Sequence, residues 1–388
     1  MIVDTFKASL DPSVFRLYRR YLYSRYKQTD ELSQGEVVHE KAKEKLVSMA
    51  PMFREHSGMF DGGPELAVRI GGHLLASPVG LAAGFDKNCD LLLPTSHVFG
   101  FVTPGSVLLK PRAGNPQSPK SGGTTRLAID DERQAIINAQ GYPHKGLEYS
   151  LANLRTFATD SNRGKAKVLL NFSGITEDYT EDAVLDACKE IISRTSPYVD
   201  LGFEENRTSP NTDFNKVLQS AEFTRKIIDL MNSHIPSGLL KVSKVSPYSS
   251  LEPGTAEMEE KIKSIKVFYE NGGDAVTIGN TRPIPTSSNK KSRTFSRPVA
   301  GESGRPLFPY MLRLVRDVHE KFPELPIIAC GGIFNAEDAW KALEAGASCV
   351  ELYTALTFNG FGAVREIQDG IRRKLGGKTL QEFLHKRK

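Results

Sequence analysis

The chain has little cysteine, and its four cysteines lie far apart along 388 residues: Cys89, Cys188, Cys330 and Cys349. No two of them have the C-x-x-C spacing of zinc sites or cysteine-ligated iron–sulfur clusters, so we predict that no metal is bound. Isolated cysteines in a chain of this length are typical of a reducing compartment. Cys330 and Cys349 lie in apolar runs and are interpreted as small core residues.

Long apolar runs and an excess of one charge sign are also missing. No run reaches the length of about 20 residues that spans a bilayer, and the first residues lack the basic and apolar regions of a signal peptide. The 51 Lys and Arg residues are nearly balanced by 46 Asp and Glu residues. One short basic run, at residues 289–293, is interpreted as part of a surface loop. We therefore expect no nucleic-acid partner.

Residues 1–60 differ in character from the rest of the chain. Residues 15–27 form a helical pattern rich in Tyr and Arg, and Asp11 followed by Pro12 is typical of a helix start. A second helix is predicted at residues 37–49. A basic, aromatic helix can lie in a membrane interface, or it can pack on the main domain through its aromatic side. The two interpretations are compatible if one face packs and the other is exposed, and we predict an N-terminal helical extension.

From about residue 61 onward, short apolar runs alternate with amphipathic stretches. Eight runs are predicted to be strands, at 78–82, 99–102, 168–171, 199–203, 239–242, 275–278, 326–329 and 349–352. Helices are predicted at 182–193, 221–231, 257–270, 310–321 and 336–345. Eight such units predict an α/β fold, a (β/α)8 TIM barrel over residues 61–388. A doubly wound open sheet is the structural alternative.

Polar or glycine-rich turns follow these strands, and residues 205–212 are the most informative of them. Asn206 and Asn211 can each donate and accept, so together they can read the carbonyl and N–H edges of a planar ligand. Ser209 lies between them and could take or give a proton. Taken alone, the segment can equally be an ordinary polar turn. It gains weight because the carboxyl ends of barrel strands meet at one face, where barrels place their functional residues.

The residues expected at that face are Lys, Asn, Ser and Gly, with almost no carboxylates, which suits a neutral or anionic planar ligand and argues against hydrolysis by paired carboxylates. Glycines at 301–304 and 331–332 lie where barrels bind phosphate on backbone N–H groups. Lys244 near an aromatic cofactor would stabilise developing negative charge. In isolation it can equally be an exposed lysine at a strand end.

Five segments resemble those of dihydroorotate dehydrogenases, which are FMN-dependent (β/α)8 barrel enzymes of pyrimidine biosynthesis. They are Ala-Ala-Gly-Phe-Asp-Lys at 82–87, Thr-Ser-Pro-Asn-Thr at 208–212, Lys-Val-Ser-Pro at 244–247, Ser-Gly-Arg-Pro-Leu at 303–307 and Leu-Tyr-Thr-Ala-Leu at 352–356. The chain is most similar to class 2, the quinone-reducing, membrane-associated branch. That branch has an N-terminal helical extension and uses serine as base where class 1 uses cysteine.

The resemblance implies oxidation of (S)-dihydroorotate to orotate, with Ser209 removing the C5 proton while C6 delivers hydride to the flavin, and with a quinone as acceptor. The substrate is then expected to contact Lys87, Asn138, Asn206, Asn211, Asn280 and Thr281. FMN is expected to contact Ala82, Ala83, Gly84, Ser106, Asn138, Asn171 and Lys244, and its phosphate Gly304, Gly332, Tyr353 and Thr354. Arg126 matches an arginine near the quinone entrance. The expected location is peripheral, on the cytosolic side of a membrane that the N-terminal helices contact.

Three segments depart from the family's pattern: Gln140-Gly141-Tyr142-Pro143, the turn at 172–176, and Phe203-Glu204-Glu205. Two rival hypotheses follow. The chain could be an FMN-dependent barrel oxidoreductase with a shifted substrate or acceptor, or a flavin-binding homologue without catalysis. The retention of Ser209 and Lys87 argues against the second rival, because a scaffold has no need of them.

Overall fold

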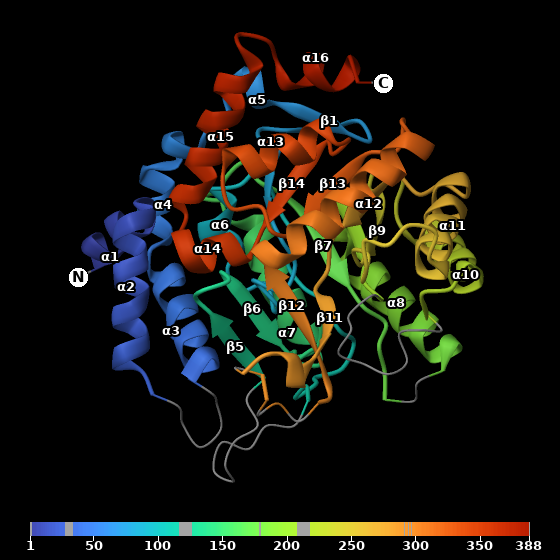
Figure 1. The fold of residues 1–388 in the computed structure, drawn as a ribbon, viewed down its shortest axis with the longest axis horizontal. Coiled ribbons are helices and arrows are strands. Elements are labelled where there is room, and N and C mark those ends of the chain that lie inside the picture. Colours follow the sequence, from blue (N-terminus) through green and yellow to red (C-terminus); the bar gives the residue numbers. More distant parts are fainter. Residues whose placement is uncertain are drawn as a thin grey trace.

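The computed structural model describes residues 2–27, 34–115, 126–177, 180–207, 218–290, 292–293, 295 and 297–387. Within this part of the chain, eight parallel strands close into a barrel in sequence order (Figure 1). Their bounds are β3 Val79–Leu81, β4 Phe101–Val102, β7 Lys167–Phe172, β8 Gly202–Glu205, β9 Leu240–Val245, β10 Ala275–Ile278, β13 Ile327–Cys330 and β14 Cys349–Leu352. All eight predicted strands are confirmed, and the open-sheet alternative is wrong because β14 pairs with β3.

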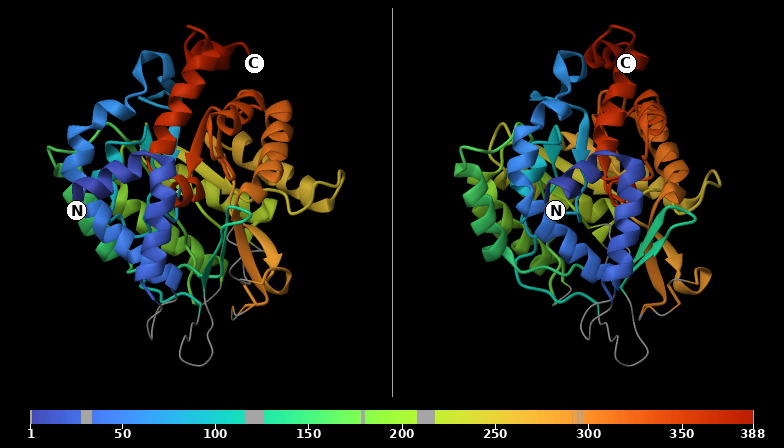
Figure 2. Two further views of the ribbon diagram at one scale, coloured as in Figure 1. Left: turned by 60° about the vertical axis from the view of Figure 1, so that its left-hand side comes forward. Right: turned by 90° about the vertical axis from the view of Figure 1, so that its left-hand side faces the viewer.

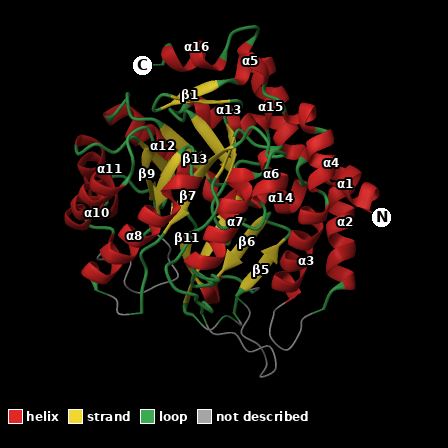
Figure 3. Cartoon of the chain, turned by 180° about the vertical axis from the view of Figure 1, so that it is seen from behind, coloured by secondary structure: helices red, strands yellow, loops and turns green. Residues whose placement is uncertain are grey.

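Helices surround the barrel on its outer side (Figure 3). They are α6 Leu92–Ser96, α7 Leu147–Thr159, α8 Glu181–Thr195, α10 Ala221–His234, α11 Ala256–Glu270, α12 Phe308–Lys321, α13 Ala336–Glu344, α14 Thr354–Asn359, α15 Gly362–Leu375 and α16 Leu380–His385. The five helices expected from amphipathic patterns are all present. Polar caps explain where several begin: the side chains of Thr180, Ser220 and Thr255 each accept a hydrogen bond from a backbone N–H of the first turn.

The N-terminal extension is helical, as predicted, and packs against one side of the barrel (Figure 2). It consists of α1 Ile2–Leu10, α2 Pro12–Arg25, α3 Gln34–Ser48, α4 Ala50–Glu55 and the short helix η1 Ser57–Phe60. Asp11 caps α2 by accepting hydrogen bonds from the backbone N–H groups of Ser13 and Val14, at 2.8 and 3.2 Å. α2 packs on α14, and α3 contacts β5.

A four-stranded antiparallel sheet stands beside the barrel and was not expected. It runs in the order β11 Arg282–Pro285, β12 Val299–Gly304, β6 Ala135–Asn138 and β5 Leu127–Asp130. In Figure 1 it lies at the end of the molecule opposite the hairpin of β1 Val68–Ile70 and β2 His73–Leu75. In its register, Gly301 is opposite Asn138. The sheet therefore places residues from two distant segments beside the carboxyl ends of the barrel strands.

Candidate active site

A cavity lies at the carboxyl ends of the barrel strands, with β6 and β12 forming part of its wall. Most of the site residues predicted from the sequence line it, although they come from nine different strands or the turns after them. Those fourteen residues are Ala82, Ala83, Gly84, Lys87, Ser106, Asn138, Asn206, Lys244, Asn280, Thr281, Gly304, Gly332, Tyr353 and Thr354.

Side-chain amides form a connected network in the wall of the cavity. The Asn280 amide donates to Asn206 Oδ1 at 3.1 Å, and the Asn206 amide donates to the Ser106 hydroxyl at 2.9 Å. The backbone N–H of Thr281 donates to Asn280 Oδ1 at 2.8 Å. Each amide is thus held in a fixed orientation before any ligand binds. A preoriented set of amides suits a planar ligand with alternating donors and acceptors, because ligands without matching groups leave buried polar atoms unpaired.

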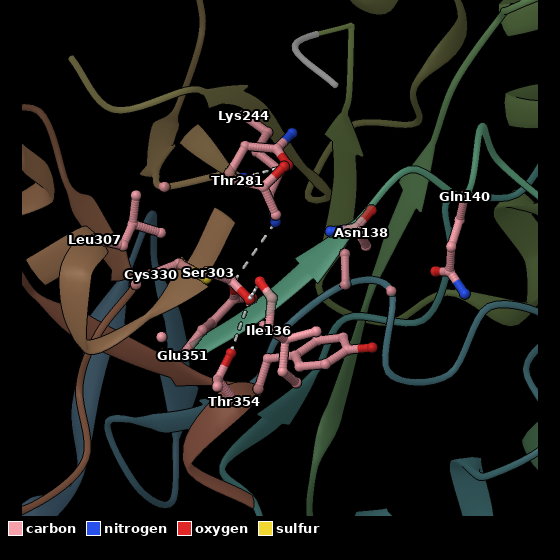
Figure 4. Close-up of a pocket in the computed structure, with 18 of the residues that line it drawn as sticks. Ile136, Asn138, Gln140, Lys244, Thr281, Ser303, Leu307, Cys330, Glu351 and Thr354 are labelled. Carbon is pink, nitrogen blue, oxygen red and sulfur yellow. Dashed lines mark hydrogen bonds and ion pairs between the residues drawn. The ribbon is translucent and has the colours of Figure 1, made fainter. Parts of the chain in front are cut away.

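Lys87 and Gln140 face each other across one side of the cavity. The Lys87 ammonium donates to Gln140 Oε1 at 2.9 Å. Burial lowers the pKa of Lys87 to about 8, helped by the positive charges of Lys43 and Arg126 and opposed by Glu36 and Glu40. An ammonium held at a cavity wall suits a carboxylate on the ligand. Gln140 was recognised only as a departure from the family's pattern, and it lines the cavity together with Asn138 (Figure 4).

Glycines form the side of the cavity near β12 and β13. Gly304 has φ +96° and Gly332 has φ +72°, which is backbone that residues with side chains rarely adopt. A Cβ on Gly332 would lie 2.6 Å from the backbone nitrogen of Phe308. The Thr354 hydroxyl donates to Ser303 Oγ at 3.1 Å in the same region (Figure 4). Bare backbone and hydroxyl groups in this position suit the close approach of a phosphate.

Two buried carboxylates accompany Lys244, and one of them, Glu351, is the single carboxylate among the described residues that line the cavity, in line with the expectation of almost no carboxylates at this face. Lys244 Nζ lies 3.2 Å from Glu204 Oε1 and 3.9 Å from Glu351 Oε2. Both glutamates are at most 1% exposed. Burial alone lowers the pKa of Lys244, but the two carboxylates outweigh it and raise that pKa above its usual value. Lys244 is therefore a buried ammonium that lines the cavity, and the alternative of an exposed lysine is wrong.

Two predicted residues, Asn171 and Arg126, do not line this cavity. Asn171 is fully buried on β7, where its amide donates to Glu204 Oε1 at 2.6 Å, and its Oδ1 has no hydrogen-bond partner among the described residues. Arg126 lines a neighbouring polar cavity and forms an ion pair with Glu36 at 2.8 Å. Ser209 and Asn211 lie outside the residues that the structure describes.

A second, largely apolar cavity lies between the N-terminal helices and the barrel. α2 contributes Leu22 and Tyr23, and α3 contributes Val38 and Leu46. Arg126 does not line this apolar cavity, because its guanidinium bonds to Glu36 and to the backbone oxygens of residues 113 and 115.

Two charged side chains line the apolar cavity instead, Arg19 of α2 and Lys45 of α3. Arg19 is 7% exposed, pairs with Asp131, and its Nε has no hydrogen-bond partner among the described residues. Leu127, Ile136 and Tyr353 line both this cavity and the active-site cavity, and so separate the two.

Several lining residues were not selected from the sequence as site residues. Glu351 lies inside an apolar run, where a charge in a barrel strand was the one signal that could have revealed it. Cys330 was interpreted as a core residue, but it is partly exposed and lines the cavity, whereas Cys349 is buried as expected. Ser303 lies within a matched segment yet was given no role. Gln140 and Tyr142 come from a segment whose fold could not be foreseen.

Comparisons with known proteins agree with this geometry. The family described as Dihydroorotate dehydrogenase matches residues 65–375. A dihydroorotate dehydrogenase (quinone) of Erythrobacter litoralis is 31% identical over 334 residues, which is 85% of this chain and 88% of that protein. The corresponding protein of Sphingopyxis alaskensis is 30% identical over 94% of this chain and 93% of its own length. A crystal structure of Eimeria tenella DHODH in complex with ferulenol has a TM-score of 0.73 at 27% identity, covering 89% of this chain and 94% of that one.

Proposed function

Since this chain belongs to the dihydroorotate dehydrogenase family, we propose that it oxidises (S)-dihydroorotate to orotate in de novo pyrimidine biosynthesis, with FMN as cofactor and a quinone as final acceptor. The observation that carries the proposal is the single cavity that combines Lys87, the Asn206–Asn280 amide network and Lys244. A cation for a carboxylate, amides for a pyrimidine ring and a second cation for an electron-rich cofactor are the groups this reaction needs.

The residues of the cavity fit a flavin nucleotide. Asn171, which the resemblance assigns to FMN, does not line the cavity, but its Oδ1 is a buried acceptor without a partner among the described residues. The glycine backbone at Gly304 and Gly332, with the Thr354 hydroxyl in the same wall, suits a phosphate, and the close contact of Gly332 with Phe308 leaves no space for a Cβ at that position. Lys244 would stabilise negative charge on the ring system. We assign Ala82, Ala83, Gly84 and Ser106 to the same ligand because they line the cavity beside Tyr353.

In the proposed reaction the chain's own groups bind and orient the substrate and move one proton. The Lys87 ammonium holds the substrate carboxylate, while Asn138, Asn206, Asn280 and Thr281 fix the pyrimidine ring. The bound flavin supplies the hydride acceptor. Ser209 removes the C5 proton, and Asn211 binds the ring from the same turn; both assignments rest on the sequence alone. A serine hydroxyl needs a further proton acceptor to act as a base.

The first test is the flavin absorbance of the purified protein before and after dihydroorotate is added without oxygen. Bleaching is expected. Ser209→Ala should retain the flavin but slow its reduction by about 10²- to 10⁴-fold, the usual contribution of a general base, and Ser209→Cys should recover part of the rate. A bound flavin that does not bleach in the wild type would favour the rival with a shifted substrate, because Gln140 and Tyr142 line the cavity where the family's pattern differs.

The apolar cavity is proposed as the quinone site, since it adjoins the active site through Leu127, Ile136 and Tyr353. Because Arg19 lines the apolar cavity and Arg126 does not, we assign the polar contact with the quinone to Arg19 rather than to Arg126. Truncation of residues 1–30 should reduce quinone turnover while sparing single-turnover flavin reduction. Equal loss of both activities would mean that the helices are only structural.

The outer face of α2 is proposed to rest on a membrane surface. Val14, Leu17 and Tyr21 are 46%, 66% and 50% exposed, and their spacing places them on one face of the helix. Arg16 and Arg20 are exposed beside them, as expected for a helix that lies in an anionic interface. Among the residues that the structure describes, no helix is long and apolar enough to cross a bilayer. The side of the membrane stays a prediction.

Two leucines of α2 separate these roles. Leu22 lines the apolar cavity, whereas Leu17 is exposed. Leu22→Glu should abolish turnover with a short-chain, water-soluble quinone. Leu17→Glu should leave that turnover intact and weaken binding to anionic lipid vesicles in a flotation assay. The opposite pattern would contradict both assignments.

A further inference from the structure

Two carboxylates and one ammonium share a water-poor position beneath the active-site cavity. Lys244 Nζ of β9 lies 3.2 Å from Glu204 Oε1 of β8 and 3.9 Å from Glu351 Oε2 of β14, and each of the three side chains is at most 5% exposed. Lys244 and Glu351 line the cavity (Figure 4). We call these three residues the buried charge cluster. With every group ionised, the cluster has a net charge of −1, which is unfavourable in a medium of low polarity.

The hydrogen bonds of the cluster satisfy only one oxygen of each carboxylate. Glu204 Oε1 accepts from Lys244 and from the Asn171 amide, and Glu351 Oε1 accepts from the Thr103 hydroxyl at 2.6 Å. Glu204 Oε2 and Glu351 Oε2 have no hydrogen-bond partner among the described residues. A proton on one of these oxygens would remove the excess charge. The cluster is therefore arranged to hold one proton between two carboxylates.

We propose that Glu351 binds this proton when the flavin is reduced and releases it when the flavin is reoxidised, so that the buried charge cluster balances the charge that the bound flavin gains and loses. This inference rests on the proposed function. Hydride transfer brings two electrons and one hydrogen, so the site gains one negative charge while the substrate's C5 proton leaves through Ser209. Glu351 then takes up one proton from solvent. Reoxidation removes the two electrons and the hydride hydrogen, Glu351 releases its proton, and the quinone becomes a quinol with two electrons and two protons.

The surroundings of Glu351 single it out as the titrating member. Burial raises the pKa of Glu351 to about 7, opposed by Lys244 and reinforced by Glu204. The Cys330 thiol on β13 also faces it, and burial raises the pKa of that thiol well above neutral, so Cys330 stays uncharged. Lys244 stays charged because its pKa is also raised. A further negative charge in the cavity would raise the pKa of Glu351 again, which is the direction that proton uptake requires.

The test is the midpoint potential of the bound flavin as a function of pH, measured by equilibration with mediators. In the wild type, the plot of midpoint potential against pH should become steeper above about pH 7 than below it. The added slope corresponds to one proton per two electrons, which is about 30 mV for each tenfold change in proton concentration. Glu351→Gln keeps the shape of the side chain but holds no exchangeable carboxyl proton, so its slope should lack this increment. Equal slopes in the wild type and Glu351→Gln would overturn the proposal.

Two further variants keep the result specific. Glu205→Gln removes a neighbouring buried carboxylate that pairs with Arg207 and lies outside the cluster, so the increment should remain. Its loss in Glu205→Gln would overturn the assignment to Glu351. Glu204→Gln removes a negative charge that raises the pKa of Glu351, so the steep region should begin at lower pH; an unmoved onset would count against the cluster. If Glu351→Gln does not fold, the pH at which the steep region begins in Glu204→Gln tests the proposal instead.

An independent readout does not depend on turnover. Infrared difference spectra between the oxidised and reduced states should show a carboxylic acid band gained on reduction in the wild type at pH 8, and no gain in Glu351→Gln. A wild-type spectrum without that band would overturn the proposal. Because the flavin can be reduced at an electrode or by dithionite, these measurements remain valid even if dihydroorotate is not the substrate. A failure of the proposed function is thus distinguishable from a failure of this inference.

Discussion

Lys87 offers a direct test of how burial controls substrate binding. Its ammonium lines the cavity, bonds to Gln140 Oε1 at 2.9 Å, and has a pKa lowered to about 8 by burial. Only the charged form can pair with the substrate carboxylate. The KM for dihydroorotate should therefore be constant below about pH 8 and should rise about tenfold for each pH unit above it. Substitution by methionine keeps most of the side-chain length and removes the charge.

The expected size of the effect follows from the interaction that is lost. A hydrogen bond to a charged partner contributes about 1.5–3 kcal/mol, so Lys87→Met should raise the KM about 10- to 150-fold at pH 7. The rise above pH 8 should disappear in this variant. Lys145→Met is a matched control, because Lys145 borders the neighbouring polar cavity and packs on the Tyr149 ring at 4.1 Å. It should retain the wild-type pH profile.

The stability of the protein separates binding from folding in this experiment. The pKa of Lys87 is lower in the folded state than its ordinary value of 10.5, so its charged form destabilises the fold. The destabilisation, about 3 kcal/mol, is fully present below about pH 8 and is lost as the pH rises toward 10.5. Lys87→Met should therefore not lower the unfolding free energy at pH 7. A wild-type KM that stays flat between pH 7 and 9.5 would refute the reasoning.

Two further predictions concern the cofactor cradle and the extension. Gly332→Ala should lower the flavin content and the melting temperature, because its Cβ would lie 2.6 Å from Phe308. Gly72→Ala is the control, because Gly72 has φ +86° but open space around it, and its flavin content should be unchanged. Flavin absorbance per mole of protein and thermal unfolding measure the two effects, and equal flavin loss in both variants would contradict a cofactor site at Gly332. Glu36→Ala should destabilise the protein by about 3–5 kcal/mol in urea unfolding, because it leaves the buried Arg126 guanidinium unpaired. Replacing both residues by methionine should cost less, and an equal or larger loss would argue against the ion pair.

The barrel could be predicted from the sequence because each of its strands is a short, mainly apolar run that can be recognised locally. Runs such as 275–278 and 349–352 are largely apolar, since strands of a parallel barrel are buried on both faces, and their bounds match the observed β10 and β14. Boundaries were less certain where the signal is weak. The predicted strand at 199–203 is observed at 202–205, because its last two residues are buried glutamates, Glu204 paired with Lys244 and Glu205 paired with Arg207.

The side sheet could not be predicted, for a physical reason. Pro283 and Pro285 fall within β11, and proline in a sequence normally argues against a strand. Proline is tolerated here because β11 is an edge strand of the sheet. Its pairing partner β12 follows a charged segment, and β5 and β6 lie more than 130 residues away along the chain. The sequence could name Asn138 as a site residue only through the family's motif. That Gln140 would face Lys87 depends on the turn that follows β6, which no local pattern specifies.

Leu127, Ile136 and Tyr353 line both the active-site cavity and the apolar cavity, so a change at any of the three affects both cavities. An inhibitor that fills the apolar cavity would contact these three side chains, which also line the active-site cavity where dihydroorotate would be oxidised. Mutations at these three positions that exclude such an inhibitor would also reshape the neighbouring chamber. Mutations that confer resistance to such an inhibitor should therefore arise first at residues that line only the apolar cavity, such as Leu22 or Val38. Inhibitors that bind mainly to Leu127, Ile136 and Tyr353 should select resistance mutations least often.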